Sequence, residues 1–346
     1  MRQVLTFLYL SLFSVSMVGQ TELTLQSGGI ERSYILYIPQ GGAAQKPLVL
    51  NLHGYTSSAS QQMLLSGMNE AADAHDFIVV YPQGTPDGFG LNHWNAWQDA
   101  GDVDDVVFIS DLIDYLISEQ NVDEDQVFAC GFSNGGIMSY TLACQLFTKV
   151  KAIASVAGTM SPEMIDACDA PSGYPIMHIH GTSDAVVPIG GTTQGTGVGE
   201  LVSVEDVLSH WTTINSCLFQ DEETLPNTNL LDMCSVEKRV YSGCDTGTEV
   251  WYYSVIGGGH SWPGGIPTIV LGNTNQDIDA NEEIWLFFQQ VPAESTFIEP
   301  IASEASGDII RIADLRGREV SAEYLFPGQL YLYFFADGTI RKVVVQ

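Results

Sequence analysis

A serine, an aspartate and a histidine stand in this chain where they could form a catalytic triad. Residues 131–135 read GFSNG and match G-x-S-x-G, the pattern of a sharp turn that exposes a nucleophilic serine, here Ser133. A serine hydroxyl is a weak nucleophile until a base removes its proton, and a third group must orient that base. Asp184 and His260 follow in the chain order Ser, acid, His that accompanies this kind of turn. The three residues predict acyl transfer, with Ser133 as nucleophile, His260 as general base and Asp184 orienting His260.

The residues around Ser133 are typical of a strand, a tight turn and a helix. An apolar run at 126–130 precedes the GFSNG motif, and a helical pattern at 134–147 follows it. The motif needs glycine on both sides of the serine because a side chain there would collide within the turn. We therefore expect the turn to lift the Ser133 hydroxyl to one edge of a sheet.

The acid and the base each follow a predicted strand. Asp184 comes after the apolar run 176–180, and His260 lies in the glycine-rich stretch GGGHSWPGG after the run 250–255. Alone, Asp184 could be an ordinary turn residue and His260 an ordinary loop residue. Together with Ser133, in this order and at strand ends, they favour a triad.

Two backbone N–H groups are candidates for an oxyanion hole. Asn134 is the first helical residue after Ser133, so its N–H would face the oxygen of a tetrahedral intermediate. Tyr55 follows a predicted strand, 47–52, and a His-Gly turn, which is the usual source of the second N–H in such sites. We interpret His53 in this turn as structural.

Aromatic and histidine residues could extend the site. Trp262, two residues after the base, and Trp97 are candidates for substrate binding, although packing is an equal interpretation for Trp97. His178 and His180 share one strand face, but no third ligand lies at a spacing that would complete a metal site. We therefore predict no metal ion and no cofactor.

The wider sequence predicts an α/β sheet that would position these residues. Apolar runs typical of strands buried on both faces alternate with helical patterns. The predicted strands are 33–38, 47–52, 77–81, 126–130, 150–156, 176–180 and 250–255, and the predicted helices are 62–75, 107–119, 134–147, 204–215 and 281–290. Ser203 and Asn281 are expected to cap two helices, and Asp104 and Asp105 a third. This alternation favours a doubly wound, mostly parallel sheet, whose ligands bind at the carboxyl ends of its strands.

Both ends of the chain differ from its middle. Residues 1–19 combine Arg2 with an apolar run and indicate a signal peptide, too short to span a membrane. The body, residues 22–292, would be the catalytic domain. In residues 293–346, short β-like runs alternate with turn dipeptides, which predicts a linker and a small C-terminal all-β module. The expected strands of this module are 309–312, 330–335 and 339–345.

Cysteines and charge indicate the environment. All 6 cysteines follow the predicted signal peptide, which is typical of an oxidising compartment. Several pairings are possible; we favour Cys217 with Cys244, and a free, buried Cys130 is an open alternative. The net charge of −30 argues against nucleic acid or an anionic membrane as a partner. Neutral or weakly charged substrates are expected.

Six blocks of this sequence together resemble the secreted polyhydroxybutyrate depolymerase family, which also contains feruloyl and acetylxylan esterases. The blocks are HG at 53–54, YPQG at 81–84, DDV at 104–106, GFSNGG at 131–136, HGTSD at 180–184 and GGHSWPGG at 258–265. The resemblance covers roughly residues 25–290 and implies the α/β-hydrolase fold, an extracellular carboxylic ester hydrolase and the same triad. It leaves open whether the ester belongs to a hydroxyalkanoate polyester or to a plant cell-wall polysaccharide. Cys130 departs from the family, in which a small non-cysteine residue is usual at this position.

The tail resembles the C-terminal sorting domain of type IX secretion substrates. The matching stretches are IADLRGREV at 312–320 and PGQLY at 327–331, followed by the basic pair at 341–342 and VVV at 343–345. The resemblance implies that secretion machinery recognises the tail and that the tail takes no part in catalysis.

Two other functions fit part of these observations. A serine peptidase of the same fold would need a pocket for an amide substrate and often a cap or propeller domain, which the sequence does not indicate. A non-catalytic surface protein that binds polysaccharide would be supported by loss of a triad member, and none is missing. The sequence therefore predicts a secreted serine ester hydrolase whose partner is an ester-bearing polymer or oligomer.

Overall fold

The computed structural model describes most of the chain. The described residues are 20–41, 45–96, 103–193, 199–267, 269–291, 309–313, 330–335 and 340–344. The predicted signal peptide, residues 1–19, and Trp97 lie outside them. The chain divides into two compact units, Met1–Ser295 and Thr296–Gln346.

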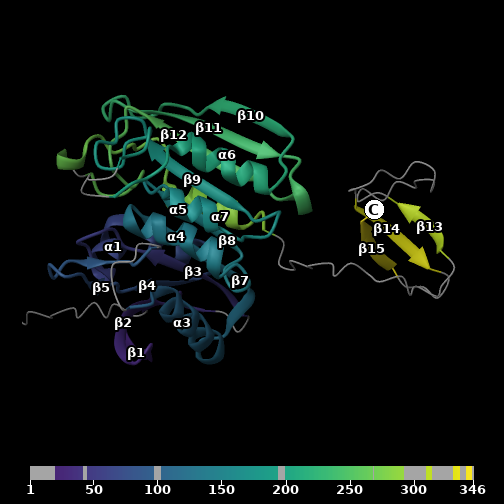
Figure 1. The fold of residues 1–346 in the computed structure, drawn as a ribbon, viewed down its shortest axis with the longest axis horizontal. Coiled ribbons are helices and arrows are strands. Elements are labelled where there is room, and N and C mark those ends of the chain that lie inside the picture. The colour runs from purple at the N-terminus through teal and green to yellow at the C-terminus, as the bar shows by residue number, and fades with distance from the viewer. Residues whose placement is uncertain are drawn as a thin grey trace, which may run out of the picture. The chain divides into compact units, whose positions relative to one another are not determined.

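The first unit is built on a 10-stranded sheet with the order β1-β2-β4-β3-β7-β8-β9-β12-β11-β10 (Figure 1). The central strands from β4 to β12 pair in parallel, and two strands at each edge pair antiparallel. The strands are β1 (Gln20–Ser27), β2 (Ile30–Tyr37), β3 (Lys46–Leu52), β4 (Ile78–Pro82), β7 (Val122–Phe132), β8 (Ala152–Val156), β9 (Ile176–Gly181), β10 (Phe219–Thr224), β11 (Ser235–Ser242) and β12 (Val250–Ile256). A separate small ribbon pairs β5 (Thr85–Pro86) with β6 (Asn92–His93).

Helices connect these strands. They are α1 (Ala59–Ser66), α2 (Met68–His75), α3 (Asp105–Glu119), α4 (Asn134–Gln145), α5 (Pro162–Ala167), α6 (Val204–Ile214) and α7 (Ala280–Phe288), with short 3-10 turns at Asp245–Gly247 and Ile269–Leu271. Within the described part of the chain, no helix is both long enough and apolar enough to cross a membrane.

The central strands are buried on both faces, as their apolar runs predict. Along β3, Leu48 and Leu50 pack into one hydrophobic core, while Val49 between them packs into a second. Helices α3, α4 and α6 contribute to the first core, and α1, α2 and α7 to the second. Because successive strand residues face opposite sides, a solid apolar run is what a sheet between two helical layers requires. The doubly wound, mostly parallel sheet is confirmed.

The helix starts differ in part from the prediction. Ser203 caps α6 by accepting a hydrogen bond from the N–H of Asp206, as expected. The cap of α7 is Asp279 rather than Asn281, which lies inside the helix. The single helix predicted at 62–75 is two helices, because Gly67 adopts a left-handed φ of 65° between them.

The expected strand 33–38 corresponds to β2, but the other antiparallel edge strands, β1, β10 and β11, were missed by the sequence pattern. All six residues of β10 are exposed, and acidic side chains dominate this strand. Such a strand lacks the apolar run by which the buried strands can be recognised, and charges on an edge strand discourage pairing with another molecule. In the sequence, β10 therefore looks like a polar stretch and not like a strand.

The second unit contains a 3-stranded antiparallel sheet in the order β13-β14-β15. Its strands are β13 (Ile309–Ala313), β14 (Leu330–Phe335) and β15 (Ile340–Val344), close to the three predicted runs. This agrees with a small all-β module at the C-terminal end.

Two disulfides lie in the first unit. Cys217 is bonded to Cys244, which confirms the favoured pairing, and Cys144 is bonded to Cys168. Cys130 is a buried free thiol, and burial raises the pKa of this group. The open alternative for Cys130 is therefore the correct one.

A buried ion pair fixes the start of α3. The Arg32 guanidinium donates to the Asp105 carboxylate at 2.6 Å and lies 3.9 Å from the centre of the Phe108 ring. Both charged side chains are almost completely removed from solvent. Asp104 caps α3 by accepting from the N–H of Val107, as predicted, whereas Asp105 does not act as a cap. The prediction for Asp105 is corrected because its charge compensates the buried Arg32.

Replacing Asp105 alone should destabilise the protein strongly. Asp105→Leu leaves the Arg32 guanidinium buried without a counter-charge, and we expect a loss of about 3–5 kcal/mol in the free energy of unfolding. Urea denaturation measures it. The double variant Arg32→Met/Asp105→Leu removes both charges and should recover most of the loss. A double variant as unstable as the single one would show that the stranded charge is not the cause.

Candidate active site

The candidate site lies where the strand order of the sheet reverses. Strand β3 pairs in parallel with β4 on one side and with β7 on the other. The chain runs from β3 to β4, and then crosses back over β3 to form β7. The chain therefore leaves β3 and β7 toward opposite faces of the sheet, and such a switch point is where ligands of these sheets usually bind. Tyr55 follows β3 and Ser133 follows β7, so both predicted residues lie at this point.

Ser133 occupies a strained turn between β7 and α4. Its φ of 55° and ψ of −117° lie outside the regions that non-glycine residues usually adopt. Its N–H donates to the carbonyl of Val156 at 2.8 Å, which holds the turn in place. A Cβ on Gly131 would lie 2.3 Å from the Gly135 carbonyl oxygen, and a Cβ on Gly135 would lie 2.2 Å from the carbonyl oxygen of Leu52. Only glycine fits at either position, as the G-x-S-x-G pattern predicts.

Asp184 and His260 form a buried pair. His260 Nδ1 lies 2.7 Å from Asp184 Oδ2, and both side chains are almost fully buried. The other carboxylate oxygen of Asp184 accepts from the backbone N–H groups of Val186 and Val187, each at 2.8 Å. Both oxygens are thus engaged, which fixes the direction of the carboxylate toward His260. With Nδ1 donating to Asp184, Nε2 of a neutral His260 is free to accept a proton.

The loop that carries His260 is held by its own backbone. The N–H of His260 donates to the carbonyl of Leu271, and the N–H of Gly259 donates to the carbonyl of Asn273, both at 2.8 Å. The ring of Phe132, next to Ser133, lies 4.8 Å from the His260 ring, centre to centre. Among the described residues the Ser133 hydroxyl makes no hydrogen bond to His260. Such a bond often tightens only when substrate binds.

The two predicted oxyanion donors border Ser133. A Cβ on Gly54 would lie 3.4 Å from the Cβ of Ser133, so the loop that begins with Gly54 and Tyr55 approaches the nucleophile closely. Asn134 is the first residue of α4, and its N–H has no carbonyl partner one turn earlier in the helix. The exposed Tyr55 side chain turns away to donate to Asp87. The backbone, rather than the phenol, is what Tyr55 offers to the site.

Trp94 links the two loops that carry the predicted oxyanion donors, a contact that the sequence did not indicate. The backbone N–H of Trp94 donates to Asn134 Oδ1 at 2.7 Å, and Asn134 Nδ2 donates back to the Trp94 carbonyl at 3.2 Å. The Trp94 indole N–H donates to the carbonyl of His53 at 2.9 Å. These bonds join positions about 40 residues apart, so no local pattern could have indicated them.

His53 is structural, as interpreted. It is buried, and burial lowers its pKa to about 4. Its Nε2 accepts from the N–H of Gly84 at 2.9 Å, and its Nδ1 lies 2.8 Å from the carbonyl of Gly54. An imidazole with one accepting and one donating nitrogen is neutral, and here it joins the loops that follow β3 and β4.

The predicted substrate-binding role of Trp262 is corrected. Its side chain is fully buried and belongs to the hydrophobic core on the side of α7. A side chain without exposed surface cannot line an open subsite. Trp262 instead packs inside the loop 257–265 that carries the predicted base His260, which we call the base loop. Trp97, the other candidate, lies outside the described residues.

His178 and His180 form a buried polar chain instead of a metal site. Tyr140 Oη lies 2.7 Å from His178 Nδ1, and His178 Nε2 lies 3.1 Å from His180 Nδ1. Within the described ranges, no three His, Cys, Asp or Glu side chains are grouped so that they could hold a metal ion.

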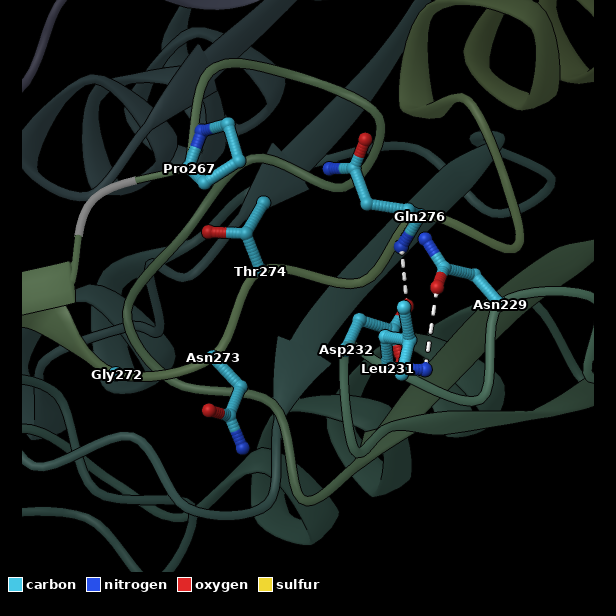
Figure 2. A pocket seen from close by; sticks show the side chains of 8 residues that line it. All are labelled: Asn229, Leu231, Asp232, Pro267, Gly272, Asn273, Thr274 and Gln276. Atoms are coloured by element: carbon cyan, nitrogen blue, oxygen red, sulfur yellow. Dashed lines mark hydrogen bonds between the residues drawn. The ribbon is translucent and has the colours of Figure 1, made fainter.

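A cavity of about 370 Å³ lies beside the base loop (Figure 2). It is lined by Asn229, Leu231, Asp232, Pro267, Gly272, Asn273, Thr274 and Gln276. The carboxylate of Asp232 accepts from the backbone N–H of Gln276 at 2.7 Å, which ties its two walls together (Figure 2). Ser235 at the start of β11 pairs with Ile256 at the end of β12, so the loop before β11 lies at the same sheet edge as the base loop.

Comparison with known proteins agrees with this geometry. Residues 35–196 match the phospholipase/carboxylesterase family. The solved acetyl xylan esterase from Aspergillus awamori superposes with a TM-score of 0.54 at 15% identity, over 78% of this chain and 98% of that one. The chain therefore has the α/β-hydrolase fold.

Several curated relatives are esterases. The chain is 29% identical over 233 residues to a bifunctional acetylxylan esterase/xylanase of Neocallimastix patriciarum and 30% identical over 237 residues to feruloyl esterase B of Piromyces equi. These matches cover 67% and 66% of this chain but only 31% and 42% of those longer proteins. A poly(3-hydroxyalkanoate) depolymerase of Paucimonas lemoignei is 29% identical over 35% of the chain and 30% of its own length. Each of these proteins is thus matched over less than half of its own length, and all are named for action on esters.

The depressed pKa of His53 predicts a pH dependence of stability. Since its pKa falls from about 6.5 in the unfolded chain to about 4 when folded, the unfolded state binds the extra proton between these values. His53 therefore contributes stability above pH 6.5 that is lost as the pH falls toward 4. Urea denaturation at several pH values should show a shallower slope for His53→Gln, by up to about 1.4 kcal/mol per pH unit. Equal slopes in both proteins would contradict this interpretation, whatever the absolute stability of the variant.

Proposed function

We propose that this α/β-hydrolase chain cleaves carboxylic esters carried by a polymer, through an acyl-enzyme on Ser133. The observation that carries the proposal is the buried Asp184–His260 pair, held at the sheet edge where the strained Ser133 turn lies. Fixed carboxylate, directed imidazole and strained serine turn are the parts that acyl transfer requires.

The reaction follows from these positions. His260 Nε2 takes the proton of Ser133 as its oxygen attacks the ester carbonyl, and the backbone N–H groups of Tyr55 and Asn134 stabilise the oxyanion. His260 then donates that proton to the leaving alcohol. Water attacks the acyl-enzyme in the same way, and the acid leaves. Asp184 keeps its hydrogen bond to His260 Nδ1 and stabilises the imidazolium.

The substrate class we favour is the feruloyl or acetyl ester of plant cell-wall polysaccharide. The relatives named for such esters match about two thirds of the chain, whereas the polyester depolymerase matches about one third. The cavity beside the base loop supports the same choice. Asp232 in its wall can only accept hydrogen bonds, and a polyester offers no donors along its chain, whereas sugar hydroxyls do. Short polyester is the alternative.

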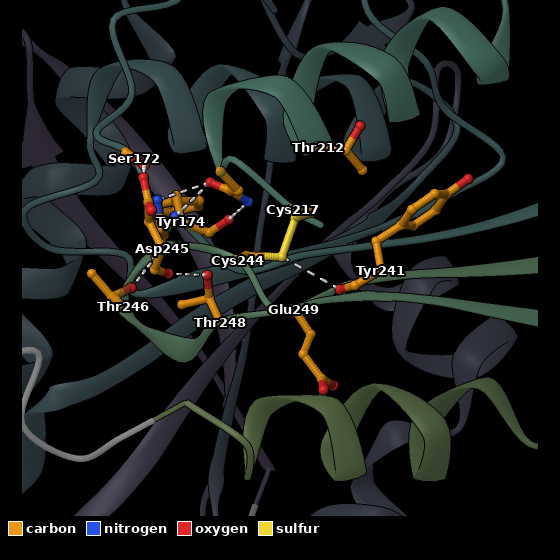
Figure 3. Close-up of a disulfide and its surroundings, with 12 residues drawn as sticks. Ser172, Tyr174, Thr212, Cys217, Tyr241, Cys244, Asp245, Thr246, Thr248 and Glu249 are labelled. Carbon is orange, nitrogen blue, oxygen red and sulfur yellow. Dashed lines mark hydrogen bonds between the residues drawn. A yellow bond between two sulfur atoms is a disulfide. The ribbon is translucent and has the colours of Figure 1, made fainter. Parts of the chain in front are cut away.

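Export is part of the proposal. Residues 1–19 would direct the chain out of the cytoplasm, and the pair of disulfides is typical of an oxidising compartment. Figure 3 shows the Cys217–Cys244 bridge at the end of β11, next to the turn that begins with Asp245. The strands β13 to β15 would be the part that type IX secretion machinery recognises, and they have no role in the proposed chemistry.

Removal of the nucleophile should abolish ester hydrolysis. Wild type and Ser133→Ala are compared on p-nitrophenyl acetate, p-nitrophenyl butyrate, methyl ferulate, acetylated xylan and poly(3-hydroxybutyrate) film. We expect kcat to fall about 10⁴-fold or more in the variant, because no other group replaces the serine oxygen. The substrate that wild type prefers separates a cell-wall esterase from a polyester depolymerase.

Ser118→Ala, an exposed serine on α3, is the matched control and should retain full activity. Activity that survives Ser133→Ala would rule out the mechanism. A wild type that is inert on every ester would instead favour the polysaccharide-binding protein.

Replacing the orienting carboxylate should slow the reaction without unfolding the protein. Asp184→Asn keeps an oxygen for the two backbone donors but turns an amide toward His260, which favours the wrong tautomer. We expect kcat to fall on the order of 10⁴-fold with a nearly unchanged KM. Asp166→Asn on the exposed face of α5 is the control. A kcat within tenfold of wild type would remove Asp184 from the triad.

A further inference from the structure

The turn that holds Asp184 is itself held by a buried histidine. His180 Nε2 lies 2.8 Å from the carbonyl oxygen of Val187, the residue whose N–H donates to Asp184 Oδ1. The same Nε2 lies 3.6 Å from Asp184 Oδ2, the oxygen that binds His260. His180 therefore contacts both the turn and the carboxylate, and its side chain is completely buried.

The carbonyl of Val187 determines which atom donates in each hydrogen bond that links His180, His178 and Tyr140. A carbonyl only accepts, so His180 Nε2 must carry the proton and donate. His180 Nδ1 is then an acceptor, which requires His178 Nε2 to donate to it at 3.1 Å. His178 Nδ1 in turn accepts from the hydroxyl of Tyr140 at 2.7 Å. One arrangement satisfies every polar atom of this chain of three side chains.

Burial keeps these three hydrogen-bonded side chains neutral and in fixed positions. Desolvation lowers the pKa of His178 and of His180, and each imidazole is neutral around neutral pH. The two rings stack with planes 5° apart and centres 5.2 Å apart, between strand β9 and the helix α4 that follows Ser133. A buried polar group left without its partner is costly, so the three side chains hold one another in place.

The proposed reaction itself does not use these three hydrogen-bonded side chains. His180 has no path to the substrate through the described contacts, because both its nitrogens are engaged with Val187 and His178. What remains for His180 is the orientation of Asp184. Its N–H places a positive partial charge near Asp184 Oδ2, the oxygen that accepts the hydrogen bond from His260 Nδ1.

We propose that His180 is a positioning residue for the reaction, which holds the Val187 turn and so fixes the direction of Asp184 toward His260. The hydrogen bonds of His178 and Tyr140 keep His180 in the tautomer that carries its proton on Nε2. The proposal rests on the triad assigned above. It adds His180 as a residue that supports Asp184, because a catalytic side chain keeps its position only if the groups around it hold it there.

Two substitutions test the hydrogen bonds of His180. His180→Phe keeps a flat ring but removes both bonds, whereas His180→Gln can donate to Val187 and accept from His178. A displacement of about 1 Å in such a site can lower a rate about 100-fold, so we expect kcat to fall ten- to hundredfold in His180→Phe with KM within about twofold. His180→Gln should recover a large part of kcat. Tyr174→Phe, which loses a buried hydroxyl bonded to the Val150 carbonyl, is the control for destabilisation alone and should keep its kcat.

A spectroscopic measurement separates this proposal from the proposed function. The proton between His260 Nδ1 and Asp184 should give a downfield ¹H NMR signal in wild type, absent in His260→Gln. We expect it to shift or broaden in His180→Phe and to persist in His180→Gln and Tyr174→Phe. This signal needs no substrate, so it tests the positioning even if wild type is inert on every ester.

Three results would overturn the proposal. They are an unchanged signal and kcat in His180→Phe, a His180→Gln as defective as His180→Phe, and a Tyr174→Phe that loses kcat to the same extent. If His180→Phe does not fold, Tyr140→Phe takes its place, because it removes the hydroxyl that donates to His178 Nδ1. A signal and a kcat in Tyr140→Phe that match those of Tyr174→Phe would then contradict the proposal.

Discussion

The parallel pairing of β3 with β7 is the constraint on which the candidate site depends. Leu52 at the end of β3 lies opposite Gly131 of β7, so the loops that leave these strands start side by side. Helix α4 can pass the end of β3 only because residue 135 has no side chain. This one contact brings Ser133 close to the two predicted oxyanion donors. The proposed acid and base then follow β9 and β12, which are themselves neighbours in the sheet. The geometry of the site is largely a property of strand order.

The histidines of the candidate site differ in the group that each ring nitrogen faces. His53 and His180 each face a backbone carbonyl, and a carbonyl forces the facing nitrogen to donate. Burial then removes the charged form of these rings. His260 differs because its Nδ1 lies 2.7 Å from the carboxylate of Asp184 instead of facing a carbonyl. The acceptor beside each ring thus separates the structural histidines from the proposed base.

The sequence indicated those features of the fold and the candidate site that local residue patterns encode. Apolar runs located the central strands, since a strand between two helical layers must be apolar on both faces. The serine turn, acid and base could be placed because each follows such a run. The Arg32–Asp105 pair and the Trp94 bridge could not be foreseen, because their partners are 40 to 73 residues apart. Trp262 was wrong for a related reason: an aromatic residue beside a base looks the same in sequence whether it packs inward or faces substrate.

Burial of Cys130 keeps one thiol out of disulfide exchange. In an oxidising compartment all 6 cysteines of the unfolded chain compete for partners, yet only four are paired in the structure. Cys130 lies at the centre of the sheet, three residues before the serine, where no oxidant reaches it. In the folded chain Cys144 and Cys168 are bonded to each other, so neither has a free thiol to pair with Cys130. The strand that leads into the serine turn thus also protects a free cysteine from mispairing.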